Sequence, residues 1–292
     1  MFSPYNSRAV LPGHIKDLEK CYKINPRNIF STNPKTEKSA VQTYILHFSP
    51  ANTSGVNVCE NAKNCAKICL HFAGNPAYLN VKQQARLRRT LAFNSNKEAF
   101  MLLLVCAILG LINKNLGEQI AIRLNGTSDI RWEEIDFTIT PEFASFCRAK
   151  YGAILPIGKR NIFEVFNYLK ENTGELVTFY DYSKLERNWA ECARLGYHLT
   201  FSFDGHDNKQ NAKIARNALA NGVNVAAAFN IKRSQSLPTE WIWQGKKREV
   251  LDGDLSDFRP DDKQGGHIIG LRFKLPHGMK WSQSERDSFC MA

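Results

Sequence analysis

The sequence predicts an α/β fold in which eight mostly parallel strands form a (β/α) barrel, complete or partly open, behind an irregular N-terminal lead-in. From about residue 40, short β-rich runs alternate with helical patterns, as parallel strands joined by crossover helices do. Polar residues gather after the strands, where the active sites of such folds lie. The 292 residues, 43% of them hydrophobic, can bury one large core. A doubly wound sheet is the alternative, because strand order cannot be read from one sequence.

Three regions are expected along the chain. Residues 1–40 contain four prolines and are predicted to form an extended or loosely helical extension. Residues 41–275 are predicted to form a single barrel-like domain with a cysteine loop at 59–69, and residues 276–292 a polar tail.

The expected strands are short runs rich in β-branched and aromatic residues, bounded by glycine and polar residues. They cover Thr43–Phe48, Gln119–Leu124, Ile154–Ile157, Leu176–Tyr180, Tyr197–Ser202, Val223–Ala228, Arg248–Asp252 and His267–Lys274.

Helical patterns fill the gaps between these strands. A long helical stretch between the first two strands breaks at residues 94–96, where Ser95 and Glu98 match a capping box for a second helix that ends near Gly117. Its apolar run, Phe100–Ile112, is shorter than the roughly 20 residues of a membrane span, so it predicts a buried helix and no membrane association. Later helices are expected at Pro141–Lys150, Asn161–Glu171, Lys184–Leu195 and Lys209–Asn221.

The chain is strongly basic. Thirty-nine Lys and Arg against 28 Asp and Glu give a formal charge of +11, which attracts the phosphates of nucleic acid. The alternative is a basic protein whose charge only keeps it dispersed. The N-terminus lacks the basic, apolar and small-residue order of a secretory signal, so we expect a cytoplasmic protein. No pattern specifies a protein partner.

Three cysteines, Cys59, Cys65 and Cys69, lie within eleven residues directly after the first expected strand. One loop can bring three thiolates to one soft metal centre and leave a coordination position open, as in an iron-sulfur cluster held by three cysteines. Zinc held by the same cysteines and His71 is the structural alternative, and unligated thiols are the third. The other five cysteines stand alone and are expected to be core or surface thiols.

The loops after later strands carry further candidates. Asn125, Ser128 and Asp129 follow the second strand, Lys184 follows the fourth and Asp204 the fifth. In either predicted architecture these positions meet at the carboxyl edge of the sheet, beside the cysteine loop. Asp204 is therefore a candidate for acid or base work together with His206.

The sequence is similar to the phage "gene product 88" family from about Val58 to Lys274. The resemblance rests on the cysteine loop and on the motifs at 123–129, 179–184, 199–202 and 252–254. It implies a phage or prophage origin and no particular activity.

A cysteine trio after the first strand of a barrel also resembles radical S-adenosylmethionine enzymes, although five and three residues separate the cysteines here instead of the usual three and two. That resemblance implies a [4Fe-4S] cluster on the three cysteines and S-adenosylmethionine bound at its open iron. Asn125, Ser128 and Asp129 are then cofactor contacts.

Other motifs have two interpretations each. Tyr182 is a candidate nucleophile for DNA nicking, although the chain has no His-x-His pair, and packing is the alternative role for its neighbour Tyr180. Asp252, Asp254 and Asp257 match either a magnesium site or a solvated acidic turn. His198 is expected to be a core histidine. The basic residues Lys82, Arg86, Arg88 and Arg89 form either a binding face or an ordinary exposed helix face.

The sequence thus predicts a phage-type iron-sulfur protein, most simply a radical S-adenosylmethionine-like enzyme acting on nucleic acid or a nucleotide. Its catalytic candidates are Lys184, Asp204 and Tyr182, with Asp254 as a further substrate-side candidate. The alternative is a basic DNA-binding replication protein, such as a nicking initiator, with a structural zinc or iron-sulfur site.

Overall fold

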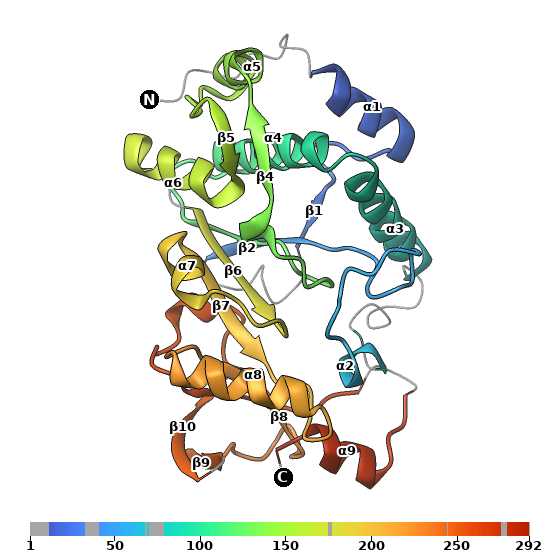
Figure 1. Ribbon diagram of the computed structural model, residues 1–292, viewed down its shortest axis with the longest axis vertical. Coiled ribbons are helices and arrows are strands. Elements are labelled where there is room, and N and C mark those ends of the chain that lie inside the picture. The colour runs from blue at the N-terminus through green and yellow to red at the C-terminus, as the bar shows by residue number, and fades with distance from the viewer. Residues whose placement is uncertain are drawn as a thin grey trace.

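The protein is built around one nine-stranded sheet (Figure 1). The computed structural model describes residues 12–32, 41–67, 69, 79–174, 177–243, 245–275 and 279–291. In spatial order the strands are β1 (Phe30–Ser31), β2 (Gln42–Leu46), β3 (Ile120–Arg123), β6 (Val177–Ser183), β7 (Tyr197–Ser202), β8 (Val225–Phe229), β11 (Ile268–Arg272), β10 (Lys246–Asp252) and β9 (Glu240–Trp243).

The predicted barrel is wrong, because this sheet is open. The seven strands from β2 to β10 pair in parallel, but β1 joins β2 and β9 joins β10 in antiparallel fashion. These two strands form the edges of the sheet and do not pair with each other. The chain also places β11 between β8 and β10, which breaks the sequential order that a barrel requires.

Seven of the eight predicted strands correspond to strands of this sheet, and the prediction for Ile154–Ile157 is wrong. Ile154 and Ile157 are 56% and 57% exposed, and the strand β5 (Gly158–Asn161) begins only after them. It pairs with β4 (Asp136–Ile139) in a separate antiparallel ribbon. The sequence analysis also missed β1 and β9, which are short edge strands with little burial.

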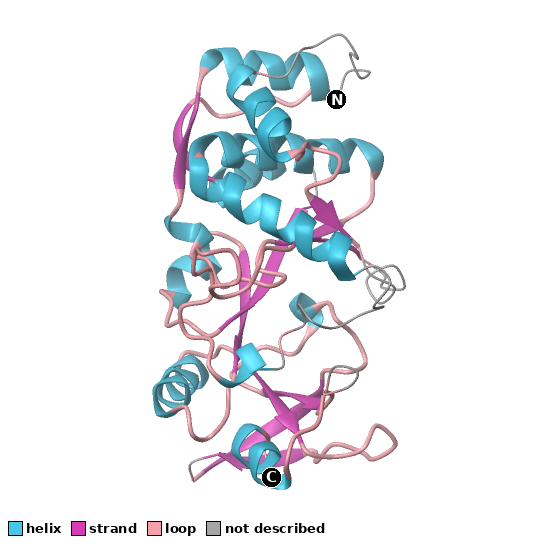
Figure 2. Cartoon of the chain, turned by 90° about the vertical axis from the view of Figure 1, so that its right-hand side faces the viewer, coloured by secondary structure: helices cyan, strands magenta, loops and turns pink. Residues whose placement is uncertain are grey.

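The helices lie mainly against one face of the sheet. Figure 2 shows most of them at one end of the long axis, whereas the strands extend along it. They are α1 (Gly13–Tyr22), α2 (Asn64–Lys67), α3 (Leu79–Ser95), α4 (Lys97–Lys114), α5 (Pro141–Tyr151), α6 (Ile162–Thr173), α7 (Trp189–Arg194), α8 (Lys209–Ala220) and α9 (Gln283–Phe289), with short 3-10 turns η4 (Trp132–Glu134) and η5 (Arg259–Asp261).

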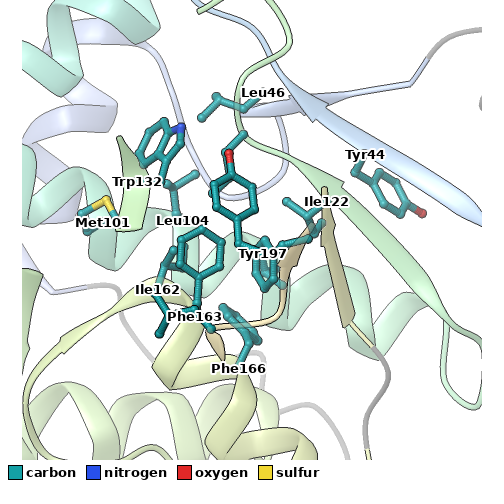
Figure 3. Packing of buried hydrophobic residues seen from close by; sticks show 14 of the residues in the cluster. Tyr44, Leu46, Met101, Leu104, Ile122, Trp132, Ile162, Phe163, Phe166 and Tyr197 are labelled. Atoms are coloured by element: carbon teal, nitrogen blue, oxygen red, sulfur yellow. The ribbon is translucent and has the colours of Figure 1, made fainter. Parts of the chain in front are cut away.

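The core lies between the sheet and these helices. Helix α4 is buried along most of its length, as its apolar run predicts. Phe163 of α6 stacks on Tyr197 of β7 with 4.4 Å between the ring centroids, and Trp132 packs in the same core (Figure 3). No helix in the described part of the chain is long and apolar enough to cross a membrane.

Three local predictions need correction. The cap of α4 is Asn96, whose side chain accepts the Ala99 N–H at 2.9 Å, while Ser95 is the last residue of α3. The lead-in is not irregular throughout, because Ile15 and Leu18 bury one side of the regular helix α1. Helix α7 is shorter than predicted and begins only at Trp189, after the Asn188 cap.

The opposite face of the sheet carries polar and aromatic side chains. Tyr180 and Tyr182 of β6 are in register with His198 and Thr200 of β7, so all four point to this face. The segment before η5 crosses it and places Phe258 edge-on to Tyr180, with 5.4 Å between the ring centroids. Functional side chains can therefore reach this face, whereas the helical face is filled by core.

Candidate cysteine site at the carboxyl edge of the sheet

The cysteine loop follows β2 and lies at the carboxyl edge of the parallel strands, as predicted. Loops after β3, β6 and β7 contact it there. Thr127 after β3, Lys184 after β6 and Asp204 after β7 all accept hydrogen bonds from residues of the cysteine loop. The parallel arrangement brings these loops together because all four strands run in the same direction.

Asp204 anchors the middle of the cysteine loop. Its carboxylate is fully buried and accepts the backbone N–H groups of Lys63, Asn64 and Cys65, at 3.3, 3.1 and 2.8 Å. These N–H groups lie at the start of the short helix α2, where no carbonyl oxygen of the helix itself can accept them. Asp204 thus caps α2 from another strand, and this cap sets the position of Cys65.

Asparagine side chains complete the attachment. Asn64 Nδ2 donates to the Asp204 carbonyl oxygen at 2.8 Å and to Asp207 Oδ1 at 2.6 Å, and Asn61 Nδ2 donates to the Lys184 carbonyl oxygen at 3.1 Å. Gly205 has a φ of +100°, and an added Cβ there would lie 3.0 Å from Asn64 Nδ2. Only glycine allows this close approach without strain.

Asp129 holds the start of the loop. Its backbone N–H donates to the Val58 carbonyl oxygen at 2.7 Å, next to Cys59. Its carboxylate accepts hydrogen bonds from Ser183 Oγ, from the Lys184 N–H and from the buried Arg187 guanidinium, the last at 2.7 Å. Asp129 therefore connects the loops after β2, β3 and β6.

Asn125 and Ser128, the other predicted cofactor contacts, are also bonded internally. Asn125 Oδ1 accepts from Ser128 Oγ, from the Ile130 N–H and from Trp132 Nε1, while its Nδ2 donates to the Tyr197 hydroxyl oxygen. Both residues are less than a tenth exposed. Their observed role is to shape the loop after β3, and their contact with a cofactor stays a prediction.

The three thiols are close enough to act on one another electrostatically. Burial raises the pKa of Cys59 to about 11, and the Asp129 carboxylate and Cys69 add to this rise. Burial likewise raises the pKa of Cys65 to about 12. The Lys184 ammonium lowers this pKa, and Asp204 raises it. Both thiols therefore carry protons at neutral pH, and a metal that binds them would have to displace these protons.

Lys184 contributes a positive charge to the site. Burial lowers the pKa of its ammonium, but Cys65 in its thiolate form and the carboxylates of Asp204 and Asp129 raise it, and the net shift is upward. Lys184 Nζ donates to Ser202 Oγ at 2.8 Å. Of the predicted catalytic residues, Lys184 and Asp204 thus lie beside the cysteines.

The donor set suits a soft metal, but its geometry is not that of a closed site. In the described part of the chain, no three histidine, cysteine or carboxylate side chains are arranged to hold a metal ion. This part contains Cys59, Cys65 and Cys69, whereas His71, the fourth ligand of the zinc alternative, lies outside it.

Tyr182 and Asp254 are placed elsewhere. Tyr182 lies on the polar face of the sheet, where the Arg123 guanidinium is 5.2 Å from the centre of its ring. Asp254 follows β10, and Arg272 and Lys274 donate to its carboxylate at 3.1 and 2.7 Å. Asp252 accepts from the same Arg272 at 3.0 Å. These ion pairs give the acidic turn a structural role.

Arg187 and the loop asparagines were missed by sequence reasoning. Arg187 donates to Asp129 and to both oxygens of Glu133, although nothing in its sequence context marks it. Asn61 and Asn64 had a signal, since two amides between closely spaced cysteines can hold a loop.

The model of a family described as gene product 88 matches residues 23–291. No curated protein and no solved structure matches the chain.

Proposed function

The chain belongs to the gene product 88 family, and from the site at the edge of its sheet we propose that it is an iron-sulfur enzyme acting on nucleic acid or a nucleotide. Cys59, Cys65 and Cys69 are the proposed ligands of a [4Fe-4S] cluster. S-adenosylmethionine is the proposed occupant of the open iron, where a reduced cluster would supply an electron for its cleavage. The phage origin of the family agrees with a nucleic-acid substrate.

The observation that carries this proposal is the attachment of the cysteine loop. Asp204 accepts three consecutive N–H groups of the loop, and Asp129 fixes its start. A buried carboxylate that caps another segment is a costly feature unless the position of that segment matters. Here this attachment holds two half-buried thiols at the edge where α/β proteins bind ligands.

The residues of the chain then divide into two roles. Asp204 and Asp129 position the loop, so they are positioning residues for the cluster. Lys184 supplies a positive charge beside Cys59 and Cys65, and it stabilises the anionic form of bound thiolates. Tyr182 remains a candidate for contact with substrate, because it faces the polar side of the sheet.

Anaerobic purification followed by a visible spectrum and by iron and sulfide analysis tests the cluster. We expect a coloured protein with iron and sulfide in equal amounts. The variants Cys59→Ser, Cys65→Ser and Cys69→Ser should each lose most of the iron, while Cys21→Ser, which replaces an exposed thiol, should keep it. A colourless protein with one zinc would refute the cluster.

The cofactor is tested separately on the same protein. Addition of S-adenosylmethionine should change the electron paramagnetic resonance spectrum of the reduced cluster, because the ligand would bind its open iron. An unchanged spectrum would remove S-adenosylmethionine from the proposal and leave the cluster in place.

A DNA-binding replication protein with a structural zinc is the second candidate function. Its support is the formal charge of +11. One bound zinc ion in every preparation that binds DNA, together with DNA binding that weakens as salt is added, would favour this candidate over the enzyme.

A further inference from the structure

A cavity of about 770 Å³ lies beside α4, which contacts both α1 and α5 (Figure 1). The described residues that line it belong to α1, α4, α5, β1 and β2 and to the turn at 25–32. Its volume falls in the range of small-molecule sites, about 300 to 1,000 Å³. We call it the α4 cavity. None of these lining residues belongs to the cysteine site.

Small residues of α4 form the floor of the α4 cavity. Cys106 and Ala107 precede Gly110 by four and three positions, so the three lie on the same side of the helix. Among the described residues, the atom nearest to a Cβ added at Gly110 would be Tyr151 Cε1, at 3.9 Å. The floor is therefore apolar and leaves room above Gly110.

Aromatic rings add apolar surface to the α4 cavity. Tyr44 of β2 and Tyr151 of α5 are buried, and Phe30 of β1 is half-buried. The Tyr44 hydroxyl oxygen accepts Asn115 Nδ2 at 3.0 Å, and Asn113 Nδ2 donates to the Tyr151 carbonyl oxygen at 3.2 Å. These bonds fix both tyrosines to the end of α4. A planar apolar group can thus be buried against rings that are already held in place.

The rim of the α4 cavity is cationic. Four of the described lining residues are Lys or Arg, and one, Glu19, is acidic. Asn25 Nδ2 donates to Glu19 Oε1 at 3.2 Å. Even without Lys150, three cations remain for one carboxylate, and in the described part of the chain no ion pair joins these three to an acid. Such an excess attracts anions. The four cations are Lys16 of α1, Arg27, Lys114 of α4 and Lys150 of α5.

The turn that carries Arg27 is held by hydrogen bonds. Asn25 Oδ1 accepts the Arg27 N–H at 3.0 Å, and the Asn25 N–H donates to Asn28 Oδ1 at 2.8 Å. The Asn28 carbonyl oxygen accepts Nη2 of the buried Arg89 from α3 at 2.6 Å. Because the backbone of this turn is already ordered, binding of an anion by Arg27 costs less conformational entropy.

We propose that the α4 cavity binds a free nucleotide, with its phosphates at the cationic rim and its base on the apolar floor. Lys and Arg donate charge-assisted hydrogen bonds to phosphate oxygens, and aromatic side chains suit a planar base. A hollow bounded by several elements favours a molecule that ends inside it over a strand that continues past it. The inference does not rest on the proposed function, since the cysteine site contributes none of the described lining residues.

Calorimetric titration of the full chain with ADP, GDP, CDP and UDP tests the site. At least one of them should bind, about tenfold more tightly than pyrophosphate or the matching nucleoside, because only the intact nucleotide uses both rim and floor. Absence of binding by all four would overturn the proposal. Equal affinity for pyrophosphate and the nucleotide would also overturn it, since charge attraction alone would then explain the binding.

The rim is tested by Lys114→Gln, which should weaken nucleotide binding about fivefold by loss of one exposed phosphate contact. Lys97→Gln is the matched control, since it removes the same charge from an exposed residue at the opposite end of α4. The two residues are about 25 Å apart along the helix axis, well beyond the Debye length of about 8 Å. Lys97→Gln should keep the affinity within about twofold. Equal weakening by the two variants would refute the site.

The floor is tested by Gly110→Leu, which fills space in the α4 cavity without changing any charge. Leucine has a higher helix propensity than glycine, so the variant should fold, as thermal denaturation will check. Nucleotide binding should weaken about tenfold or more because the base loses its place. Unchanged affinity in folded Gly110→Leu would exclude the cavity as the binding site.

Titration of Gly110→Leu with a single-stranded oligonucleotide separates a free nucleotide from a nucleic-acid strand. Any affinity of the basic chain for the oligonucleotide should be the same in this variant as in the unchanged protein, because a strand does not enter the α4 cavity. An equal loss of nucleotide and oligonucleotide binding would show that the cavity takes a nucleotide of a strand, and it would overturn the choice of a free nucleotide.

Discussion

Asp204 and Cys65 are 139 residues apart in the chain, yet Oδ1 of Asp204 accepts the backbone N–H of Cys65 at 2.8 Å. The same carboxylate accepts two further N–H groups of the loop and the side-chain amide of Asn208. The position of the predicted metal ligands thus depends on a residue at the end of β7.

Replacement of this carboxylate should loosen the cysteine loop. In Asp204→Asn an amide nitrogen faces backbone N–H groups, so at least one donor loses its partner. We expect the free energy of unfolding to fall by about 2 to 3 kcal/mol, measured by urea denaturation, with a parallel loss of iron. Asp261→Asn, which replaces an exposed carboxylate, should change neither quantity. Full stability in Asp204→Asn would show that the anchor contributes little.

The ion pairs of Arg187 should be among the strongest in the protein. Its side chain is fully buried, and those of Asp129 and Glu133 are 10% and 6% exposed. Arg187→Met leaves both carboxylates without this partner, and we expect a loss of about 3 to 5 kcal/mol of unfolding free energy. The exposed pair of Arg194 and Glu191 serves as control, and Arg194→Met should cost less than about 1 kcal/mol. Similar losses in the two variants would contradict the expected effect of burial.

Gly126 should not tolerate a side chain. A Cβ at this position would clash with Ile45 Cγ2 and would lie 2.6 Å from His47 Nδ1, where the loop after β3 passes the end of β2. Gly126→Ala should therefore destabilise the protein by about 2 kcal/mol or more. Gly110→Ala, inside α4 with 3.9 Å to its nearest neighbour, should gain up to about 1 kcal/mol. Thermal denaturation of both variants checks the pair, and a neutral Gly126→Ala would mean that the loop can shift.

His198 should make the protein sensitive to acid. Burial, assisted by Arg259, lowers the pKa of His198 to about 4 from 6.5. The folded state thus disfavours the proton, so the contribution of His198 to stability is complete above pH 6.5 and is lost as pH falls toward 4. The loss amounts to up to about 3 kcal/mol between these values.

The variant His198→Gln has no proton to take up at this position. Its stability should fall less steeply than that of the unchanged protein when urea denaturation is repeated between about pH 7 and about pH 4. His14→Gln, which replaces an exposed histidine, should follow the unchanged protein. Identical pH profiles for His198→Gln and the unchanged protein would exclude His198 as the source of the acid sensitivity.

Local patterns predicted the parallel strands well because each strand carries its own signal. The residues of β7 match their predicted range, and the polar loops after β2, β3, β6 and β7 do meet. The open sheet could not be distinguished from a barrel in the sequence, since the placement of β11 between β8 and β10 depends on long-range pairing. The apolar run Ile154–Ile157 was wrongly predicted to be a strand because apolar residues also occur in exposed connections.

Residue types predicted the location of the site better than the roles of its members. Asp204 appeared suited to acid or base chemistry because it follows a strand, but strand ends also supply caps for neighbouring loops. Nothing in the sequence places the N–H groups of residues 63–65 against it. The pairing of Arg187 with Asp129 could not be predicted for the same reason, since only the folded sheet brings the two residues together.

The distant anchor of the cysteine loop has a consequence during synthesis. At about 5 to 20 residues per second, the ribosome would add Asp204 roughly 7 to 30 seconds after Cys65, which precedes it by 139 residues. Throughout that interval the nascent thiols lack the carboxylate that fixes their loop. Completion of β7, rather than emergence of the cysteines, then sets the earliest moment at which the site can mature.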